Sequence, residues 1–384
     1  MHIALNIIGL LLLLPAIPLT LELLVLSIAA IFPPRKLRTS QKTLQLAVII
    51  PAHNEETLIT PCVQSLMTTA TPQTTIYVIA HNCTDNTAAN ATAAGAKVLT
   101  LNEQSGHGKG AALHHGFTQA LAAGAEAILV IDADSTVSAT FLTAVSAAIA
   151  GGSAALQTRY IAANPSASAK TRLQSLALLG MNVLRPRGRS RLNLSCGIFG
   201  NGFALTAPTL RKVPYLAHSV VEDLEYHLHL LRANLRVDFL DTVTVRGEVP
   251  TNPTAAATQR ARWEGGRQLM RRQWTLPLLR NVLRGQLRYL EPLLDLRALP
   301  VTTTAVCLAL ALIAPLTRIP AALGLITCLL YIFVSASLSD DPLATLTALA
   351  QAPLYLAFKI AMIPKTRAAA RKDAAWVRTG RNDS

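Results

Sequence analysis

The most conspicuous pattern along the chain is a set of long apolar stretches at its two ends, with a finer alternation between them. The first stretch, from about Ile3 to Phe32, is apolar apart from Asn6, Thr20 and Glu22. It is long enough to span a bilayer with some tilt. Basic residues follow it rather than precede it, which favours an uncleaved anchor whose C-terminal side is cytoplasmic over a signal peptide. They are Arg35, Lys36, Arg38 and Lys42.

Three more apolar stretches lie near the C-terminus, at Val301–Leu316, Ala321–Leu338 and Leu343–Ile363. The basic tail at 365–384 should be cytoplasmic by the same charge rule. A cytoplasmic domain and a cytoplasmic tail require an even number of spans between them. We expect two spans followed by an interfacial helix, although one long broken span followed by the third stretch satisfies the same parity.

Between these ends, short apolar runs alternate with helical patterns. Four runs predict buried strands, at Leu46–Ile50, Ile76–Ala80, Lys97–Leu101 and Ile128–Ile131. Helices follow the first two runs, from about Glu55 to Met67 and through an alanine-rich segment to Gly95. This alternation predicts an α/β fold with a doubly wound, mostly parallel, Rossmann-like sheet. The polar turns after the strands then gather at one edge, where we expect Asn54, Glu55, Asp85, Asp132 and Asp134 to converge.

An acidic pair, Asp132 and Asp134, ends the fourth strand. Ligands of open α/β sheets bind at the carboxyl ends of the strands. Two carboxylates there favour Mg²⁺ or Mn²⁺ carrying a phosphorylated ligand. In the alternative interpretation the pair merely ends the strand and caps a helix that starts near Ser138.

A glycine-rich segment, Gln104 to Phe117, lies between the third strand and the acidic pair. Its glycines have neither the Rossmann nor the full P-loop spacing. Lys109 at the predicted helix start can still meet a phosphate, because exposed amides and an ammonium group act together there. The alternative is a lysine that is simply solvated.

The next region predicts a strand from Ala154 to Tyr160 and a helix from about Ser168 to Leu184. RPRGRSRLN, Arg185 to Asn193, reads as a basic loop facing solvent or lipid headgroups. In the segment that follows, glycines would allow the backbone to approach a ligand closely. They are Gly197, Gly200 and Gly202.

A second acidic pair, Glu222 and Asp223, opens another predicted helix. Ser219 and Glu222 have the spacing of a capping box, which gives Glu222 a structural role. That box leaves Asp223 unexplained. A carboxylate at a helix start near a sugar acceptor can deprotonate a hydroxyl group.

The helix after it carries Gln259, Arg262 and Trp263 close together on its surface. Trp offers an apolar face for a sugar ring and Arg can stabilise a departing diphosphate. The alternative is an interfacial Trp among solvated arginines.

From Pro277 to Leu290, arginines recur every four residues beside a leucine stripe. This pattern predicts one amphipathic helix on an anionic membrane face, ended by Pro292. The arginines are Arg280, Arg284 and Arg288, and the leucines are Leu279, Leu283, Leu287 and Leu290.

The net charge of +14 is too general to assign a partner by itself. No nucleic-acid-binding motif accompanies it, and much of the excess flanks apolar segments. This distribution favours anionic lipid headgroups over nucleic acid as the partner. The five cysteines have neither metal-ligand spacing nor a disulfide pattern.

Together the motifs resemble the membrane-bound family 2 glycosyltransferases, the group that includes cellulose, hyaluronan and chitin-oligosaccharide synthases. The likeness covers roughly Ala47 to Arg272. Its carriers, in chain order, are PAHNEE (from Pro51), Asp85, GKGAAL, DADS, GNGF, VED and QRARW. Each motif is weak alone, whereas the ordered set is specific. VED departs from the commoner TED and keeps both acids.

The resemblance implies a GT-A fold, a nucleotide-diphosphate sugar donor, usually UDP-linked, and transfer with inversion. It implies that Pro51, Asn54, Glu55, Asp85, Lys109 and Asp132 contact the donor and that Asp134 binds the divalent cation. It makes Asp223 the general base. The acceptor and diphosphate end of the cleft would comprise Gly200, Asn201, Gly202, Glu222, Gln259, Arg262 and Trp263.

We therefore expect an inverting transferase in the inner or plasma membrane, with a cytoplasmic catalytic domain and a lipid-linked or membrane-proximal glycan acceptor. Few spans argue against extrusion of a long polymer, unless the protein oligomerises or has a translocation partner. The alternatives are a processive polysaccharide synthase, a polyprenyl-phosphate sugar transferase and a catalytically silent scaffold. The expected organisation is an anchor (1–34), a basic linker (35–45), the catalytic domain (46–274), an amphipathic interface helix (275–298), C-terminal spans (299–364) and a basic tail (365–384).

Overall fold

The computed structural model describes the chain except residues 1, 103–107, 217–218, 220, 252 and 352–384. Within helix α11 (Pro253–Leu283), the side chains of residues 253–260 and 262 are also outside the description. The predicted basic tail and most of the last apolar stretch therefore lie outside the described residues.

One sheet organises the described part of the chain, with the strand order β3-β2-β1-β4-β7-β6-β8-β5. Strands β3, β2, β1 and β4 are parallel, as are β6 and β8, whereas β7 and β5 are antiparallel to their neighbours. The predicted mostly parallel GT-A-type sheet is confirmed. The strands are β1 (Leu46–Ala52), β2 (Thr74–His81), β3 (Lys97–Leu101), β4 (Ala127–Val130), β5 (Ser135–Val137), β6 (Ala155–Ala162), β7 (Phe203–Thr206) and β8 (Val237–Gly247).

Helices cover both faces of this sheet, because alternate residues of each strand point to opposite sides. Val48 and Ile50 of β1 pack in the core beneath helices α3 and α6, whereas Ile49 packs with α5 and α10. Helix α3 starts at Ile59, four residues later than predicted, because residues 55–58 form a turn in which the Glu55 amide donates to Thr87 Oγ1. The covering helices are α3 (Ile59–Met67), α4 (Thr87–Ala93), α5 (Lys109–Ala122), α6 (Phe141–Ala150), α9 (Ala207–Lys212) and α10 (Glu222–Arg232).

The predicted basic loop at Arg185–Asn193 is wrong. Helix α7 (Ala169–Leu179) lies where the sequence predicts a helix and is capped by Ser168. It continues through a π-helical turn (Gly180–Leu184) into α8 (Arg185–Arg191). Arg185 and Arg189 of α8 are buried. A buried guanidinium group needs carboxylate partners, and here they come from helices distant in sequence.

Those partners form what we call the ion cluster: Glu22, Arg185, Arg189, Arg267, Glu291 and Asp295. Arg185 lies 3.1 Å from Glu22 and 2.8 Å from Asp295. Arg189 contacts Glu22 at 3.3 Å and Glu291 at 2.5 Å, and Arg267 lies 3.0 Å from Asp295. The cluster joins the N-terminal apolar helix to α8, α11 and α12.

The predicted single amphipathic helix at Pro277–Leu290 is also wrong. Helix α11 (Pro253–Leu283) runs through Pro277 and ends in front of Gly285, which has φ +81°. The Gly285 amide donates to Val282 O and the Gln286 amide to Asn281 O, the hydrogen bonds of a Schellman motif. A 3₁₀ turn (Leu287–Tyr289) leads into α12 (Leu290–Arg297), where Pro292 is tolerated in the first turn.

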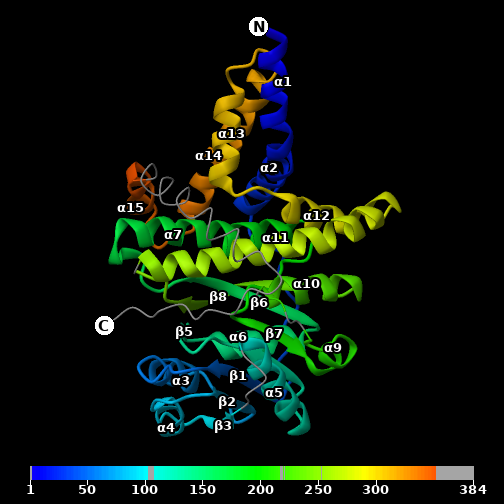
Figure 1. Cartoon of the computed structure of the whole chain (residues 1–384). Coiled ribbons are helices and arrows are strands. Elements are labelled where there is room, and N and C mark those ends of the chain that lie inside the picture. Colours follow the sequence, from blue (N-terminus) through cyan, green and yellow to red (C-terminus); the bar gives the residue numbers. More distant parts are fainter. Residues whose placement is uncertain (1, 103–107, 217–218, 220, 252, 352–384) are drawn as a thin grey trace.

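The apolar stretches form helices that stand away from the sheet (Figure 1). The N-terminal stretch comprises α1 (His2–Leu13), a 3₁₀ turn (Leu14–Ala16) and α2 (Ile17–Ile31), and the C-terminal ones form α13 (Val301–Ala311) and α14 (Arg318–Ser337). Among the described residues, His2–Ile31 and Arg318–Ser337 are long and apolar enough to cross a membrane. The pair Leu287–Arg297 and Val301–Ala311, bent by 81°, would make a third span.

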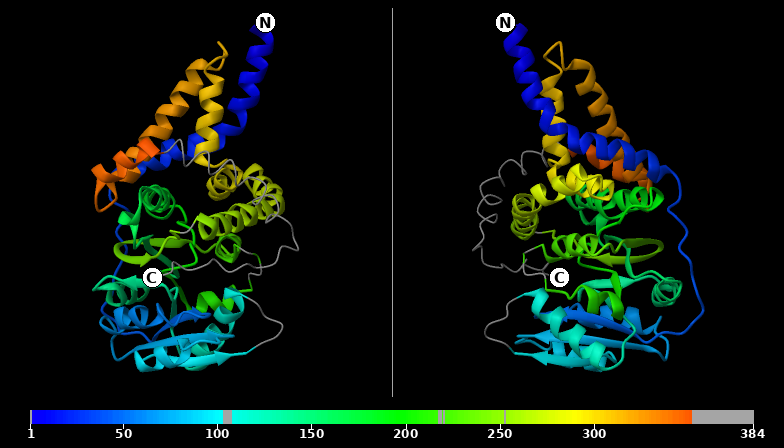
Figure 2. Two further views of the ribbon diagram at one scale, coloured as in Figure 1. Left: turned by 60° about the vertical axis from the view of Figure 1, so that its left-hand side comes forward. Right: turned by 90° about the vertical axis from the view of Figure 1, so that its right-hand side faces the viewer.

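Two contacts fix this apolar group. A Cβ added at Gly9 of α1 would lie 2.6 Å from Ala314 Cβ, so the start of the chain packs on the turn between α13 and α14. A Cβ added at Gly188 of α8 would lie 2.5 Å from Leu26 O, so α2 packs backbone to backbone on α8. Figure 2 shows helices α7, α11 and α12 as a layer between the sheet and the group of α1, α13 and α14. The third predicted stretch begins as α15 (Pro342–Thr347) and a 3₁₀ turn (Ala348–Gln351).

Candidate active site

The acidic turn after β4 lies at the carboxyl end of the parallel strands, as predicted. The Asn201 side chain holds this turn in place. The Asn201 Oδ1 atom accepts from the Asp132 amide at 3.1 Å, and the Asn201 Nδ2 atom donates to Ser135 Oγ at 2.9 Å. Ser135 Oγ in turn donates to Asp134 Oδ1 at 3.1 Å. The alternative capping role for the pair is wrong, because α6 starts at Phe141 after Thr140 and has no side-chain cap.

Lys109 opens helix α5 and reaches across to this turn. Its ammonium group forms an ion pair with Asp132 and donates to Gly200 O at 2.5 Å. Burial alone would lower the pKa of Lys109, but the neighbouring Asp132 and Glu222 carboxylates raise it above its ordinary value. Lys109 is therefore a charged group that links α5, β4 and the loop before β7.

Gly200 is the point at which these groups meet. Its φ of +73° lies in the left-handed region that favours glycine. A Cβ built there would lie 3.5 Å from Asp223 Oδ2 and 3.6 Å from Lys109 Nζ. The structure therefore brings Asp223, Lys109 and Asp132 together around one backbone position, although 91 residues separate Lys109 from Gly200.

Asp223 sits in the first turn of α10, and its Oδ1 accepts from the Leu224 amide at 2.8 Å. Burial raises the pKa of Asp223 above its ordinary value; the Leu224 amide and the Lys109 ammonium offset part of that rise, and Asp132 adds to it. A carboxylate with a raised pKa is suited to accept a proton.

The predicted capping box before Asp223 is wrong. Helix α10 starts at Glu222 itself, and the preceding residue, Val221, offers no side-chain cap. The Ser219 amide instead donates to Glu225 Oε2 at 3.0 Å. Glu222 is thus one of three acidic residues in the first turn, beside Asp223, rather than the partner of a serine cap.

A second group of predicted residues lies after β1 and β2, the strands next to β4. Asn54, at φ +54°, accepts from the Thr84 amide at 2.8 Å. Asp85 accepts from the Thr87 amide and hydroxyl and from the Glu56 amide. Burial would raise the pKa of Asp85, but these hydrogen bonds hold it below its ordinary value. The predicted convergence of Asn54, Glu55 and Asp85 is therefore present, with a carboxylate that stays ionised.

Gln259, Arg262 and Trp263 lie on α11, as predicted, and the Trp263 side chain is 43% exposed. The side chains of Gln259 and Arg262 lie outside the description. Further along α11, Met270 and Trp274 pack against Leu228 and Leu231 of α10. The two predicted helices of the acceptor side are thus packed on one another.

Sequence reasoning missed Gln157 of β6, which is fully buried. Its Nε2 donates to Asn201 O at 2.8 Å and its Oε1 accepts from the Phe199 amide at 3.1 Å. Gln157 therefore holds the backbone on both sides of Gly200. The available signal was a polar residue that directly follows an apolar run, Ala154 to Leu156, inside a predicted strand. Gly202 is packed just as tightly, since a Cβ there would lie 2.4 Å from Thr158 Oγ1.

The resulting site, which we call the acidic edge, comprises Asp132, Asp134, Glu222, Asp223 and Lys109. It has four carboxylates and one cationic side chain. Within the described residues, no three His, Cys, Asp or Glu side chains lie close enough together to hold a metal ion by themselves. A metal here would need oxygen ligands from a bound molecule, which is how Mg²⁺ is commonly held with substrate phosphates.

Comparison with known proteins places this geometry in a family. Residues 44–266 match the model described as "Glycosyltransferase like family 2". The search of curated proteins gave no match.

Among solved structures, a mannosyltransferase from Pyrobaculum calidifontis in complex with GDP-Man and Mn²⁺ is similar at 16% identity and a TM-score of 0.55, covering 95% of this chain and 97% of that one. Glucosyl-3-phosphoglycerate synthase from Mycobacterium tuberculosis, in complex with Mn²⁺, UDP and phosphoglyceric acid, is similar at 19% identity and a TM-score of 0.38, covering 56% and 75%. The first likeness shows a shared fold over nearly the whole chain.

The family model covers more than half of the chain, and it includes both the sheet edge and the start of α11. The chain therefore belongs to the family 2 glycosyltransferases and is an enzyme with the GT-A fold.

Proposed function

We propose that this enzyme transfers a sugar, with inversion, from a nucleotide-diphosphate sugar to a lipid-linked or membrane-proximal glycan acceptor. The observation that carries the proposal is the position of Asp223. Its partly buried carboxylate lies beside the Lys109–Asp132 pair around Gly200, at the carboxyl end of β4. A proton acceptor and a donor-side carboxylate are thus held next to each other.

The donor would lie along the edge formed by β2, β1 and β4. Pro51, Asn54, Glu55 and Asp85 would hold the nucleoside, and Asp132 would contact the sugar diphosphate. Asp134 offers a hard oxygen ligand, and the acidic edge has an excess of negative charge, so the residues fit Mg²⁺ or Mn²⁺. The bound cation would offset the negative charge that develops on the leaving diphosphate.

The chain's own groups would then perform the transfer. Asp223 takes the proton from the acceptor hydroxyl, whose oxygen bonds to the anomeric carbon as the carbon–diphosphate bond breaks. Lys109 would hold Asp132 in place, and its ammonium group lowers the pKa of Asp223 and so favours the ionised form. Gln259, Arg262 and Trp263 would border the acceptor and diphosphate, together with Glu222 and the Gly200–Gly202 loop, where buried Asn201 acts by positioning Asp132.

The apolar helices support a membrane-proximal acceptor. Two helices can span a bilayer, with a third in the bent pair, and the catalytic domain would lie on the cytoplasmic side because basic residues follow the first helix. So few helices favour one or a few transfers over extrusion of a polymer. The processive synthase remains the second candidate, through oligomerisation or a partner.

The test is an assay of the full chain in lipid vesicles with a panel of UDP- and GDP-sugars, Mn²⁺ or Mg²⁺, and lipid extract as acceptor. GDP-sugars are included because the mannosyltransferase above was solved with GDP-Man. We expect nucleotide release with one donor class and its loss in Asp223→Asn. Asp340→Asn, at an exposed ion pair with Arg246, is the matched control and should retain activity.

The mass of the product separates the two candidates, since one added sugar supports limited transfer and a ladder supports the synthase. Folded, membrane-inserted protein that releases nucleotide from no donor would contradict the proposal and favour a scaffold.

A further inference from the structure

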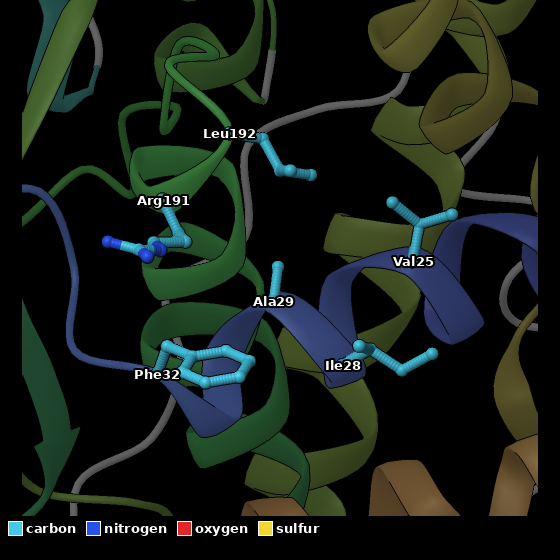
Figure 3. A pocket seen from close by; sticks show the side chains of 6 residues that line it. All are labelled: Val25, Ile28, Ala29, Phe32, Arg191 and Leu192. Atoms are coloured by element: carbon cyan, nitrogen blue, oxygen red, sulfur yellow. The ribbon is translucent and has the colours of Figure 1, made fainter.

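A pocket lies where the N-terminal apolar helix meets α8, away from the acidic edge. It has a volume of about 410 Å³ and is lined by Val25, Ile28, Ala29, Phe32, Arg191 and Leu192 (Figure 3). Its size is within the range of about 300–1,000 Å³ that is usual for ligand pockets. Five of its six lining residues are apolar, and the sixth is an arginine.

The pocket continues a stripe of exposed aliphatic side chains along α2. Their spacing of three and four residues places them on one helix face. That face is opposite the buried residues Leu19, Glu22 and Leu26, which pack towards α8 and the ion cluster. The stripe consists of Leu21, Leu24, Val25, Ile28 and Ile31, which are 38–59% exposed. An apolar chain lying along α2 would therefore reach the pocket without leaving apolar surface.

Cationic side chains lie next to the same pocket. The Arg191 guanidinium group lies 5.7 Å from the centre of the Phe32 ring. Arg35 and Arg236 both donate to Asn193 Oδ1, one residue beyond Leu192. Arg236 is paired with Asp238 at 2.8 Å. Within the described part of the chain, neither Arg35 nor Arg191 has a carboxylate within ion-pair distance. Two uncompensated guanidinium groups thus flank an apolar pocket at the end of a candidate membrane helix.

We infer that this pocket, together with Arg191 and Arg35, binds one anionic phospholipid of the surrounding bilayer. Its phosphate lies between Arg191 and Arg35, and one acyl chain follows the α2 stripe into the pocket. Guanidinium groups bind phosphate oxygens in bidentate fashion, and no acidic side chain lines the pocket to repel the headgroup. The inference rests on the membrane placement proposed above but not on catalysis.

The site would fix the depth of α2 in the membrane. Because α2 is joined to α8, α11 and α12 through the ion cluster, the bound lipid would also set the distance of the catalytic domain from the membrane surface. Lipid composition then becomes a determinant of how the acidic edge faces its acceptor.

Native mass spectrometry of the detergent-purified full chain, titrated with dioleoylphosphatidylglycerol or dioleoylphosphatidylcholine, tests this site without any sugar donor. We expect one phosphatidylglycerol to bind more tightly than phosphatidylcholine. Arg191→Gln and Arg35→Gln should each weaken it about fivefold, since one basic side chain near an anionic surface contributes about 1 kcal/mol. Val25→Trp should weaken binding of both lipids by filling the pocket.

Arg211→Gln, on exposed α9, is the matched control and should bind as wild type does. Asp223→Asn should also bind normally, which separates this inference from the proposed function. Equal affinity for the two lipids, or unchanged binding in the Arg35→Gln/Arg191→Gln double variant, would overturn the site. So would tighter binding of a polyprenyl phosphate than of phosphatidylglycerol, which would identify an acceptor site instead.

Discussion

Two regions of this enzyme bring several charged side chains together, buried or partly buried in one and partly buried in the other, and they balance the charges in opposite ways. The ion cluster between α2, α8, α11 and α12 contains three arginines and three carboxylates, each within 4 Å of an opposite charge. The acidic edge has four carboxylates and one lysine. The first region is balanced by its own side chains, whereas the second is left with negative charge.

This difference separates a structural site from a reactive one. A balanced buried cluster fixes the helices that supply its members, and breaking it leaves an uncompensated charge. An unbalanced cluster is stabilised by what it binds, and here it contains Asp223, whose pKa is raised above its ordinary value. Substitutions should therefore affect mainly stability in the ion cluster and mainly turnover at the acidic edge.

Arg189→Met should have the largest effect on stability. It removes the nearest cation of Glu291 and one of the two cations paired with Glu22. Removing one partner of a buried pair typically lowers the free energy of unfolding by about 3–5 kcal/mol. The matched control is Arg246→Met, whose pair with Asp340 is largely exposed and should contribute less than about 1 kcal/mol. Thermal unfolding of both variants in the same detergent makes the comparison. Equal midpoints would show that the cluster is not what joins the apolar helices to the catalytic domain.

Asp134→Ala should show the reverse pattern. We expect turnover to fall about a hundredfold or more, since a catalytic cation contributes several kcal/mol to transition-state stabilisation. Stability should change by about 1 kcal/mol, because the hydrogen bond that Asp134 accepts from the Ser135 hydroxyl contributes about that much. Nucleotide release is measured across a Mn²⁺ titration, with Asp340→Ala as control. Wild-type turnover at every Mn²⁺ concentration would show that Asp134 does not bind the cation.

Gly200→Ala should affect both properties. Forcing alanine to φ +73° costs about 1–2 kcal/mol, and its methyl group would lie between Asp223 and Lys109. Gly124→Ala is a matched control, because Gly124 has φ +85° with no atom within 4 Å of an added Cβ. Both variants should lose similar stability, whereas only Gly200→Ala should lose turnover. Similar turnover losses in both would attribute the effect to strain alone.

Lys109→Gln should produce the smallest and most specific change, in pH dependence. Burial raises the pKa of Asp223 above the ordinary 3.8, and the Lys109 ammonium offsets part of this rise. Turnover needs ionised Asp223, so it is lost as the pH falls through that pKa. Without the ammonium the pKa rises further, and the acid limb of the pH profile should move to higher pH. The exposed substitution Lys97→Gln should leave the limb in place; a limb that moves to lower pH in Lys109→Gln would contradict the assignment.

The sequence predicted the acidic edge well because its signals are local. An apolar run that stops on Asp132 and Asp134 predicts both the strand and the carboxylates at its end, and parallel strand order brings Asp85 and Glu55 to the same side. Asp223, the proposed base, was singled out as an acid that no local motif explained.

The ion cluster could not be predicted in this way. Arg185 and Arg189 lie in a short polar sequence that is typical of an exposed loop, and their carboxylate partners are 102–167 residues away. Gln157 was missed for the same reason, since it bonds backbone 42–44 residues away. The end of the predicted amphipathic helix was assigned to Pro292, whereas Gly285 ends α11 through its positive φ.

The most direct test of the account combines turnover, donor binding and thermal unfolding in Asp223→Asn. Loss of a general base typically lowers turnover about 10²–10⁴-fold, while donor affinity should be retained. Because the folded-state pKa of Asp223 is raised, its ionised form is disfavoured in the folded protein, so a neutral Asn should leave the unfolding midpoint unchanged or higher. Turnover within a few-fold of wild type in folded Asp223→Asn would contradict the assignment of Asp223 as the base and, with it, the proposed mechanism.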